Sequence, residues 1–228
     1  MFDLDGTLLP LDIENFIEKY FGLITEEFSD LCGPKKLIDI LMQSTGAMID
    51  NSGNKTNKEV FELSFFNRIS VDDKNKILAR FDEFYKSKFP LLKSQFKFDY
   101  NAAELISMLQ KQDYKLVLAT NPVFPRQAIW ERIKWTNVNP DVFDFITSYE
   151  NMHYSKPNIN YYKELLVKID EEPTNCVMVG NDVKEDMIAG KLGITTFLIE
   201  NYKIGAEISC EPDWQGNFSE LKKVLKSL

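Results

Sequence analysis

Apolar side chains recur every three or four residues along the first part of the chain, which is the spacing of one face of an amphipathic helix. From residue 12 to residue 92 this spacing predicts four helices joined by short polar links. The first carries Phe16 and Tyr20 on its apolar face, and the second begins at Pro34, which the first turn of a helix tolerates. Short links let successive helices pack together, so we expect a small helical bundle.

Two helix starts are marked by a hydroxyl residue followed three positions later by an acid, as in a capping box. Thr56 and Glu59 form one pair, and Ser70 and Asp73 form the other. The third helix is therefore expected to begin just after Thr56. The fourth is expected to begin just after Ser70.

After Pro90 the pattern changes, and helices alternate with short apolar runs. Alternating strands and helices imply a parallel sheet covered by helices on both faces. We therefore predict an α/β fold, a Rossmann-like doubly wound parallel sheet with an inserted helical bundle. The predicted strands are 115–119, 144–147, 176–179 and 196–199, and the predicted helices are 101–112, 125–133, 157–166 and 183–192.

The insertion divides the chain into two predicted domains. Residues 1–11 and 93–228 are expected to form the α/β core. Residues 12–92 are expected to form the helical domain, inserted between the first strand and the rest of the sheet.

The composition indicates a large buried core, since 44% of the residues are apolar and 13% are aromatic. No apolar stretch reaches about 18 residues, the length of a membrane-spanning helix, and the N-terminus lacks the features of a signal peptide. We therefore expect a cytoplasmic protein with no membrane partner. Cys32, Cys176 and Cys210 lack the spacing of zinc ligands and His153 is the single histidine, so neither a zinc site nor a histidine-based triad is expected.

The formal net charge of -8 narrows the range of partners. Non-specific binding to nucleic acid depends on clustered Lys and Arg, so we expect no nucleic-acid partner. The same charge repels an anionic small molecule at long range. Such a substrate would need a divalent metal and a fixed lysine at its binding site.

The beginning of the chain places two carboxylates two positions apart, Asp3 and Asp5, followed by Gly6 and Thr7. On an extended backbone both side chains point to the same face. Two like charges at this separation stay ionised only if a cation lies between them, or else one of them holds a proton. A solvated turn is the alternative, because Asp and Gly favour turns.

Only two residues precede Asp3, whereas a strand usually has about five or six. The first strand is therefore expected to be short. Either the natural start lies upstream, or the neighbouring strands supply the pairing.

Three later segments carry polar side chains at points where a strand ends or a helix begins. In α/β folds such points meet beyond the carboxyl ends of the strands. Residues 116–121 end in Thr120 and Asn121, Lys156 precedes Pro157, and residues 176–186 carry Asp182 and Asp186.

In order and spacing, these segments and the Asp3–Asp5 pair resemble the four motifs of the haloacid dehalogenase superfamily of phosphohydrolases, and in particular its phosphoglycolate-phosphatase-like branch. The resemblance implies that residues 12–92 are a cap that closes over the active site, with flexible links at 9–11 and 89–97. It also implies a magnesium-dependent phosphatase that hydrolyses a small phosphorylated metabolite through an aspartyl-phosphate. Dehalogenases of the superfamily generally lack the second aspartate, so Asp5 favours phosphoryl chemistry.

The resemblance assigns roles to individual residues. Asp3 would be the nucleophile, Asp5 the general acid and base, and Lys156 the cation that neutralises Asp3 and the phosphate. Asp186 would reach the metal through water or hold Lys156 in place. The implied catalytic residues are Asp3, Asp5, Thr120 and Lys156, the substrate-binding residues are Gly6, Thr120, Asn121 and Lys156, and the Mg²⁺ ligands are Asp3, Asp5, Asp182 and Asp186.

Two other functions would fit the same residues. A phosphomutase of the superfamily, similar to β-phosphoglucomutase, would return the phosphoryl group to a sugar. A non-catalytic binding or regulatory module would keep the framework without turnover. In each case we expect a monomer or a homodimer. Candidates for contacts with distal groups of the ligand are Lys35, Lys36, Asn54 and Lys55 on the insertion, although an exposed lysine is more often simply solvated.

Overall fold

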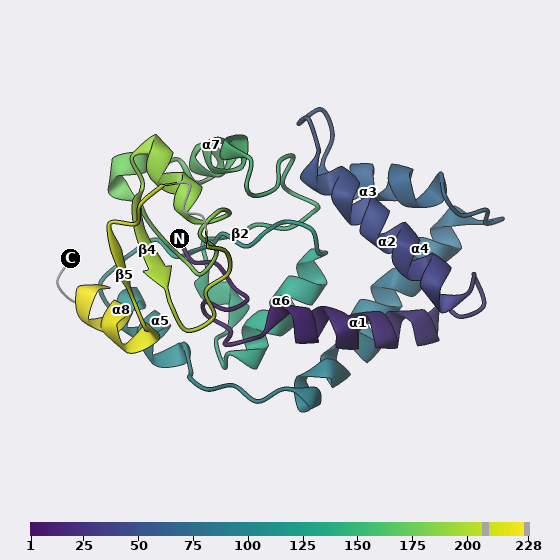
Figure 1. Cartoon of the computed structure of the whole chain (residues 1–228), viewed down its shortest axis with the longest axis horizontal. Coiled ribbons are helices and arrows are strands. Elements are labelled where there is room, and N and C mark those ends of the chain that lie inside the picture. Colours follow the sequence, from purple (N-terminus) through teal and green to yellow (C-terminus); the bar gives the residue numbers. More distant parts are fainter. Residues whose placement is uncertain (207–209, 226–228) are drawn as a thin grey trace.

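The computed structural model describes residues 1–206 and 210–225, and a parallel sheet lies in the left half of the molecule as drawn in Figure 1. Phe2 forms parallel bridges with Leu118 on one side and Val179 on the other. The segment around Phe2 therefore joins the β1–β2 pair to the β3–β4–β5 strands. The strands are β1 (Val117–Leu118), β2 (Phe145–Ile146), β3 (Val177–Gly180), β4 (Thr195–Ile199) and β5 (Trp214–Gly216), and all their pairings are parallel.

The helical insertion contains the four predicted helices, which lie together on the right of Figure 1. They are α1 (Ile13–Glu27), α2 (Pro34–Ile49), α3 (Asn57–Phe66) and α4 (Lys74–Glu83). The chain then passes through a π-helical turn, η1 (Phe84–Lys88), and a 3₁₀ segment, η2 (Phe89–Gln95). The segments that flank the sheet are α5 (Ala103–Gln110), α6 (Arg126–Trp135), η3 (Pro140–Val142), α7 (Ile159–Ile169), η4 (Pro173–Asn175), η5 (Met187–Leu192) and α8 (Phe218–Leu225).

Hydrogen bonds from both neighbouring strands hold the segment before Asp3. The Phe2 N–H donates to the Val117 carbonyl at 2.8 Å, and the Ala119 N–H donates to the Phe2 carbonyl at 2.7 Å. On the other side, the Asp3 N–H donates to the Val179 carbonyl at 2.9 Å. The neighbouring strands therefore supply pairing directly up to Asp3.

The predicted helix starts are confirmed in one case and wrong in another. Thr56 and Glu59 form the predicted capping box at the start of α3. Ser70 does not begin a helix, because the Asp73 carboxylate itself accepts the N–H groups of Asn75 and Lys76 and starts α4. An Asp at the cap position satisfies the first free N–H groups of a helix without help from a residue before it.

The C-terminal part of the sheet differs from the prediction in two places. The helix predicted at 183–192 is a turn followed by the 3₁₀ segment η5, because the Asp182 carboxylate accepts the N–H groups of Lys184 and Glu185 instead of allowing a regular helix. The sequence pattern also missed β5 and α8. β5 has only three residues, and two of them are exposed, so it lacks an apolar run.

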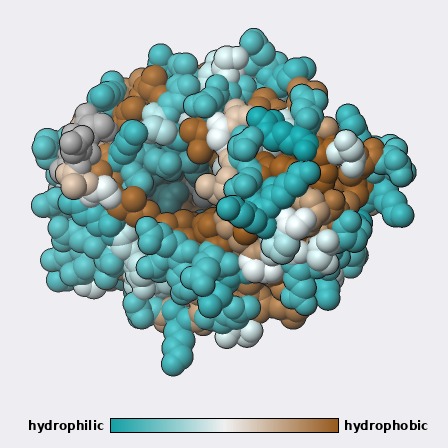
Figure 2. Space-filling view, turned by 45° about the vertical axis from the view of Figure 1, so that its right-hand side comes forward, coloured by the Kyte–Doolittle hydropathy of each residue, from teal (hydrophilic) through white to brown (hydrophobic). Residues whose placement is uncertain are grey.

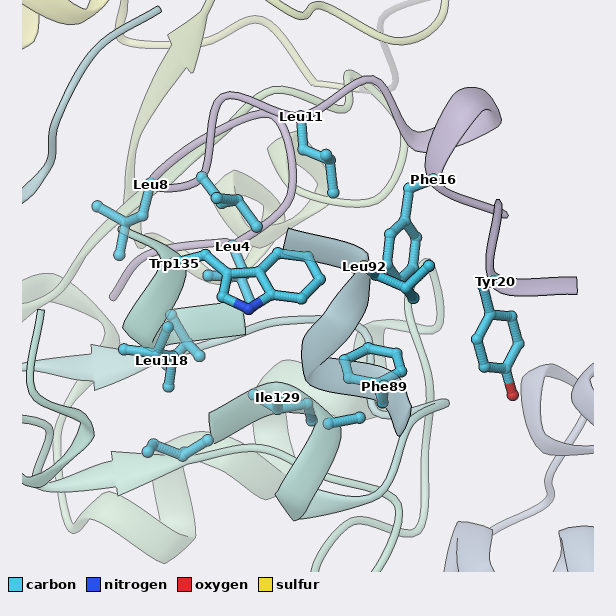
Figure 3. Packing of buried hydrophobic residues seen from close by; sticks show 14 of the residues in the cluster. Leu4, Leu8, Leu11, Phe16, Tyr20, Phe89, Leu92, Leu118, Ile129 and Trp135 are labelled. Carbon is cyan, nitrogen blue, oxygen red and sulfur yellow. The ribbon is translucent and has the colours of Figure 1, made fainter. Parts of the chain in front are cut away.

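One hydrophobic cluster extends from the sheet into the helical insertion (Figure 3). Leu118 of β1 and Trp135 of α6 belong to it, and so do Phe16 and Tyr20 of α1. The predicted link at 89–97 contributes Phe89, which is fully buried and stacks on the Trp135 ring at 5.8 Å between centroids. The helices are thus packed on the sheet region through aromatic side chains, and the exact domain boundaries stay a prediction.

The face in Figure 2 is hollowed near its centre, with hydrophilic residues in the hollow and hydrophobic residues along part of its rim. Separately, a cavity of about 130 Å³ lies between the helices of the insertion and the loop after β1. Tyr20, Phe61 and Tyr85 line it from the insertion, and Phe124 and Tyr149 line it from the sheet side. Among the described residues, no helix is both long and apolar enough to cross a membrane.

Candidate active site

The polar residues predicted at strand ends lie where the parallel sheet brings strand ends together. Asp3 follows the Phe2 bridge, Thr120 follows β1, and Asp182 follows β3. These three positions belong to adjacent strands because the Phe2 segment lies between β1 and β3. The parallel arrangement therefore explains how residues far apart in sequence reach one edge of the sheet.

Lys156 is the centre of the most buried group of charges. Its ammonium donates to Asp3 Oδ1 at 3.0 Å and to Asp186 Oδ1 at 2.6 Å. The Lys156 side chain is fully buried, and those of Asp186 and Asp3 are 1% and 12% exposed, so water screens these contacts only weakly. The other Asp186 oxygen accepts the backbone N–H of Asp182 at 3.0 Å. In this structure Asp186 therefore holds Lys156 in place.

Burial and charge act in opposite directions on this group. Burial raises the pKa of Asp3 above its usual value, and the neighbouring Lys156 ammonium opposes that change. For Lys156, burial alone would lower the pKa, but the carboxylates of Asp186 and Asp3 raise it well above its usual value. The lysine thus stays charged at neutral pH and can face an anion that approaches Asp3.

Asp5 is paired with a different cation, Arg132 on α6. The Arg132 guanidinium donates from Nη1 to Asp5 Oδ2 and is 1% exposed. Burial raises the pKa of Asp5, and Arg132 opposes that change. Sequence reasoning did not single out Arg132. The available signal was a charged residue on the apolar face of a helix, beside Ile129 and Ile133.

The Asn121 side chain is hydrogen-bonded to the loop after β3. Its amide donates to both carboxylate oxygens of Glu185, at 3.0 and 3.1 Å, and at 3.3 Å to the Lys156 carbonyl. Burial raises the pKa of Glu185 to about 8, and Lys156 opposes that rise. Glu185 is thus a further acid near Lys156 that sequence reasoning missed.

The turn after Asp5 requires a glycine. Gly6 has a φ of +80°, and a Cβ added there would lie 2.3 Å from Nδ2 of Asn181. Asn181 is itself fixed, because it accepts from the Thr7 hydroxyl at 3.2 Å and donates to the Tyr202 carbonyl at 2.6 Å. The N-terminal turn and the loop after β3 are therefore packed directly against each other.

Thr120 is held through its backbone. Its carbonyl accepts from the Thr147 hydroxyl at 2.7 Å and from the Tyr161 hydroxyl at 3.0 Å. These bonds fix the end of β1 from β2 and α7. The predicted role of the Thr120 hydroxyl toward a phosphate stays a prediction.

Asn57 at the start of α3 connects the helical insertion to the loops of the site. Its buried amide donates to the Pro122 carbonyl at 3.1 Å and to the Ser155 hydroxyl at 3.0 Å. Pro122 follows Asn121, and Ser155 precedes Lys156, so both bonds end beside predicted site residues. Sequence reasoning chose Asn54 and Lys55 on this loop, but both are exposed, and Asn57 makes the contact.

A divalent cation fits the chemistry of the acids in this region, which present only oxygen atoms. Of the Asp3 oxygens, Oδ1 accepts from the Lys156 ammonium, and the backbone of Leu4 makes a further hydrogen bond to this carboxyl group. Across those same residues, no group of three or more His, Cys, Asp and Glu side chains is close enough to hold a metal ion. Metal binding by Asp3, Asp5, Asp182 and Asp186 therefore stays a prediction, to which backbone carbonyls and water would have to contribute.

The fold and the site define a capped α/β protein whose carboxylates and lysine meet beyond the ends of parallel strands. The family model for haloacid dehalogenase-like hydrolases matches residues 1–199. The chain therefore belongs to this hydrolase family, and the resemblance in its motifs is confirmed.

Individual relatives show the range of proteins that share this architecture. A glyceraldehyde 3-phosphate phosphatase of Methanothermobacter thermautotrophicus is 26% identical over 174 residues, which cover 75% of this chain and 70% of that protein. Two solved structures are similar in fold. One is YfnB of Bacillus subtilis, a structure described as bound to magnesium and as revealing interdomain movement. Its TM-score is 0.59 at 20% sequence identity, and the match covers 99% of this chain and 96% of YfnB. The other is a 2-haloacid dehalogenase of Pseudomonas syringae, with a TM-score of 0.61 at 17% sequence identity. This match covers 99% of this chain and 96% of the dehalogenase.

Proposed function

We propose that this protein is a magnesium-dependent phosphatase that hydrolyses a small phosphorylated metabolite through a phosphorylated Asp3. The observation that carries the proposal is the pair of aspartates, Asp3 and Asp5, each bonded to its own buried cation. A single carboxylate nucleophile would serve a dehalogenase, because a halide leaves without a proton. The second carboxylate supplies the proton that an alkoxide leaving group needs.

In the first step, an Asp3 oxygen attacks phosphorus and the bond from phosphorus to the ester oxygen breaks. Asp5 gives its proton to that oxygen, so that the product leaves as an alcohol. Lys156 neutralises part of the charge on Asp3 and on the transferring phosphoryl group. In the second step, Asp5 takes a proton from water, which attacks phosphorus and releases inorganic phosphate and free Asp3.

A bound Mg²⁺ would polarise the phosphoryl oxygens and reduce the repulsion between Asp3 and the phosphate. The magnesium-bound relative and the phosphatase relative both support this proposal. In the same proposal, residues 12–92 are the cap domain, and the core consists of 1–11 and 93–228. The cap then selects the substrate and excludes water from the phosphoryl group.

A panel of phosphorylated metabolites tests the proposal, with inorganic phosphate measured in the presence of Mg²⁺ and again with excess chelator. We expect phosphate release from at least one small phosphate ester, and loss of that release on chelation. Turnover of 2-haloacids without phosphate release would contradict the proposal. Isomerised sugar phosphate without net phosphate release would contradict it in favour of a phosphomutase.

A further inference from the structure

Arg132 is a buried arginine whose position is not explained by its helix alone. It lies on the buried face of α6, where Ile129 and Ile133 are apolar. The rings of Phe124 and Phe16 lie over its guanidinium, with centroids 4.5 and 5.3 Å away. Its one hydrogen bond within the described residues goes to Asp5.

The Asp5–Arg132 ion pair is energetically unfavourable for a protein interior. The Nε and Nη2 atoms of Arg132 are buried without a hydrogen-bond partner in the described part of the chain, and so is Oδ1 of Asp5. A buried ion pair is stabilising only when its remaining donors and acceptors are satisfied, and well-packed apolar residues often do as well or better. Stability therefore does not account for an arginine at this position.

The arrangement of charges suggests a role in the site. Asp3 is hydrogen-bonded to Lys156 and Asp5 follows Asp3 by two positions, so the charge of Lys156 acts on both carboxylates. Without a second cation, Lys156 would attract both carboxylates. Arg132 on α6 gives Asp5 a separate partner, so that of these two aspartates only Asp3 is hydrogen-bonded to Lys156.

We infer that Arg132 is a positioning residue that keeps the Asp5 carboxylate turned away from Lys156, in the orientation that serves proton transfer to and from the leaving oxygen and water. This inference rests on the proposed phosphatase function. Phe16 belongs to α1 of the insertion and Phe124 to the loop after β1, so both parts of the chain fix the guanidinium. Arg132 thus acts through Asp5 and does not contact the phosphoryl group itself.

Comparing the turnover of two substrates distinguishes a positioning role of Arg132 from a purely structural role. An alkyl phosphate needs a protonated leaving group, whereas 4-nitrophenyl phosphate releases a weakly basic phenolate that does not. For Arg132→Met we expect kcat with the alkyl phosphate to fall about 10- to 100-fold, with KM within about threefold. Release of nitrophenolate in the first turnover should fall far less, and Arg132→Lys should recover part of the loss. Equal losses on both substrates would overturn the inference.

A double-mutant cycle tests whether Arg132 acts on turnover through Asp5. If Arg132 acts only through Asp5, Asp5→Asn combined with Arg132→Met should be no slower than Asp5→Asn alone, because coupled residues are not additive. Additive losses would overturn the inference. Arg126→Met is the matched control, since Arg126 is an exposed arginine of the same helix that lies over Trp130.

A crystal structure of each Arg132 variant tests the same point without turnover. We expect the Asp5 carboxylate to rotate toward Lys156 in Arg132→Met and to keep its orientation in Arg132→Lys. An unchanged Asp5 in Arg132→Met would overturn the inference even if the protein is a phosphatase. If the parent protein releases no phosphate from any ester, the proposed function fails, and the orientation of Asp5 in these crystals still decides whether Arg132 positions it.

Discussion

The Lys156 ammonium lies 3.0 Å from Oδ1 of Asp3, although 153 residues separate the two in sequence. Both groups are buried, so the contact places a fixed positive charge against the carboxylate that we propose as nucleophile. An anionic substrate approaching a protein of net charge -8 would find this local cation at the reacting atom.

Removal of Lys156 should destabilise the protein as well as inactivate it. Lys156→Met leaves Asp3 and Asp186 without their common cation, and breaking a buried pair typically costs about 3–5 kcal/mol. Urea unfolding should show this loss in the free energy of unfolding. Lys184→Met is the control, because Lys184 is exposed and its loss should change stability by less than about 0.5 kcal/mol. Equal effects of the two changes would contradict the description of Lys156 as a buried, paired charge.

Asn57→Ala tests whether the insertion is attached to the site loops through this residue. The change removes the partner of the Pro122 carbonyl and one of the two hydrogen bonds that the Asn51 amide donates, and leaving a buried group unpaired costs about 1–3 kcal/mol. Hydrogen exchange should increase near residues 122–124 and 152–156. Asn54→Ala is the control, because Asn54 is exposed and its amide bonds to Ser52 of its own loop. Unchanged exchange in those segments would show that Asn57 does not couple them to the insertion.

Gly6→Ala should disturb the turn after Asp5, because an alanine is strained at a φ of +80° and its Cβ would meet Asn181. We expect a loss of more than about 1 kcal/mol in stability and a fall in activity. Gly22→Ala offers the opposite case, since Gly22 lies inside α1 with nothing within 4 Å of an added Cβ. That variant should gain about 0.5–1 kcal/mol by helix propensity. A neutral Gly6→Ala would be inconsistent with the close approach of Asn181.

Glu185 should make stability depend on pH. Its pKa rises from 4.5 when unfolded to about 8 in the folded protein, chiefly through burial. Between these values the folded state binds more protons than the unfolded state, so this contribution to stability is full below about pH 4.5 and is lost as pH rises to 8. Glu185→Gln should flatten that part of the curve of unfolding free energy against pH. An identical slope in the variant would mean that another group is responsible.

The sequence was sufficient to predict that the polar residues of separate segments lie at one edge of the sheet, because adjacent parallel strands bring their carboxyl ends together there. Asp3, Thr120 and Asp182 each follow an apolar run, and Lys156 joins them from the start of the α7 region. The helical insertion followed from its periodicity. The local patterns therefore predicted most of the strands and helices and placed Asp3, Thr120 and Asp182 at strand ends, and the roles of these residues stay a prediction.

The missed residues act through contacts that no local pattern encodes. Arg132 and Asp5 are 127 positions apart in the sequence, and Asn57 and Ser155 are 98 positions apart. Helix periodicity relates residues a few positions apart, so it does not predict either contact. An arginine among the apolar residues of α6 was a visible irregularity, but its partner depended on how α6 packs. β5 was missed for a different reason, since it is short and mostly exposed.

The most direct test of the central claim is to detect phosphate on Asp3. The protein is mixed with Mg²⁺ and the best phosphate ester from the panel, quenched in acid during turnover, digested, and analysed by mass spectrometry. We expect the N-terminal peptide to carry one phosphoryl group on Asp3, and Asp3→Asn to carry none and to lose activity by orders of magnitude with folding preserved. An unmodified Asp3 during rapid phosphate release, or an Asp3→Asn variant within about tenfold of the parent, would contradict the account.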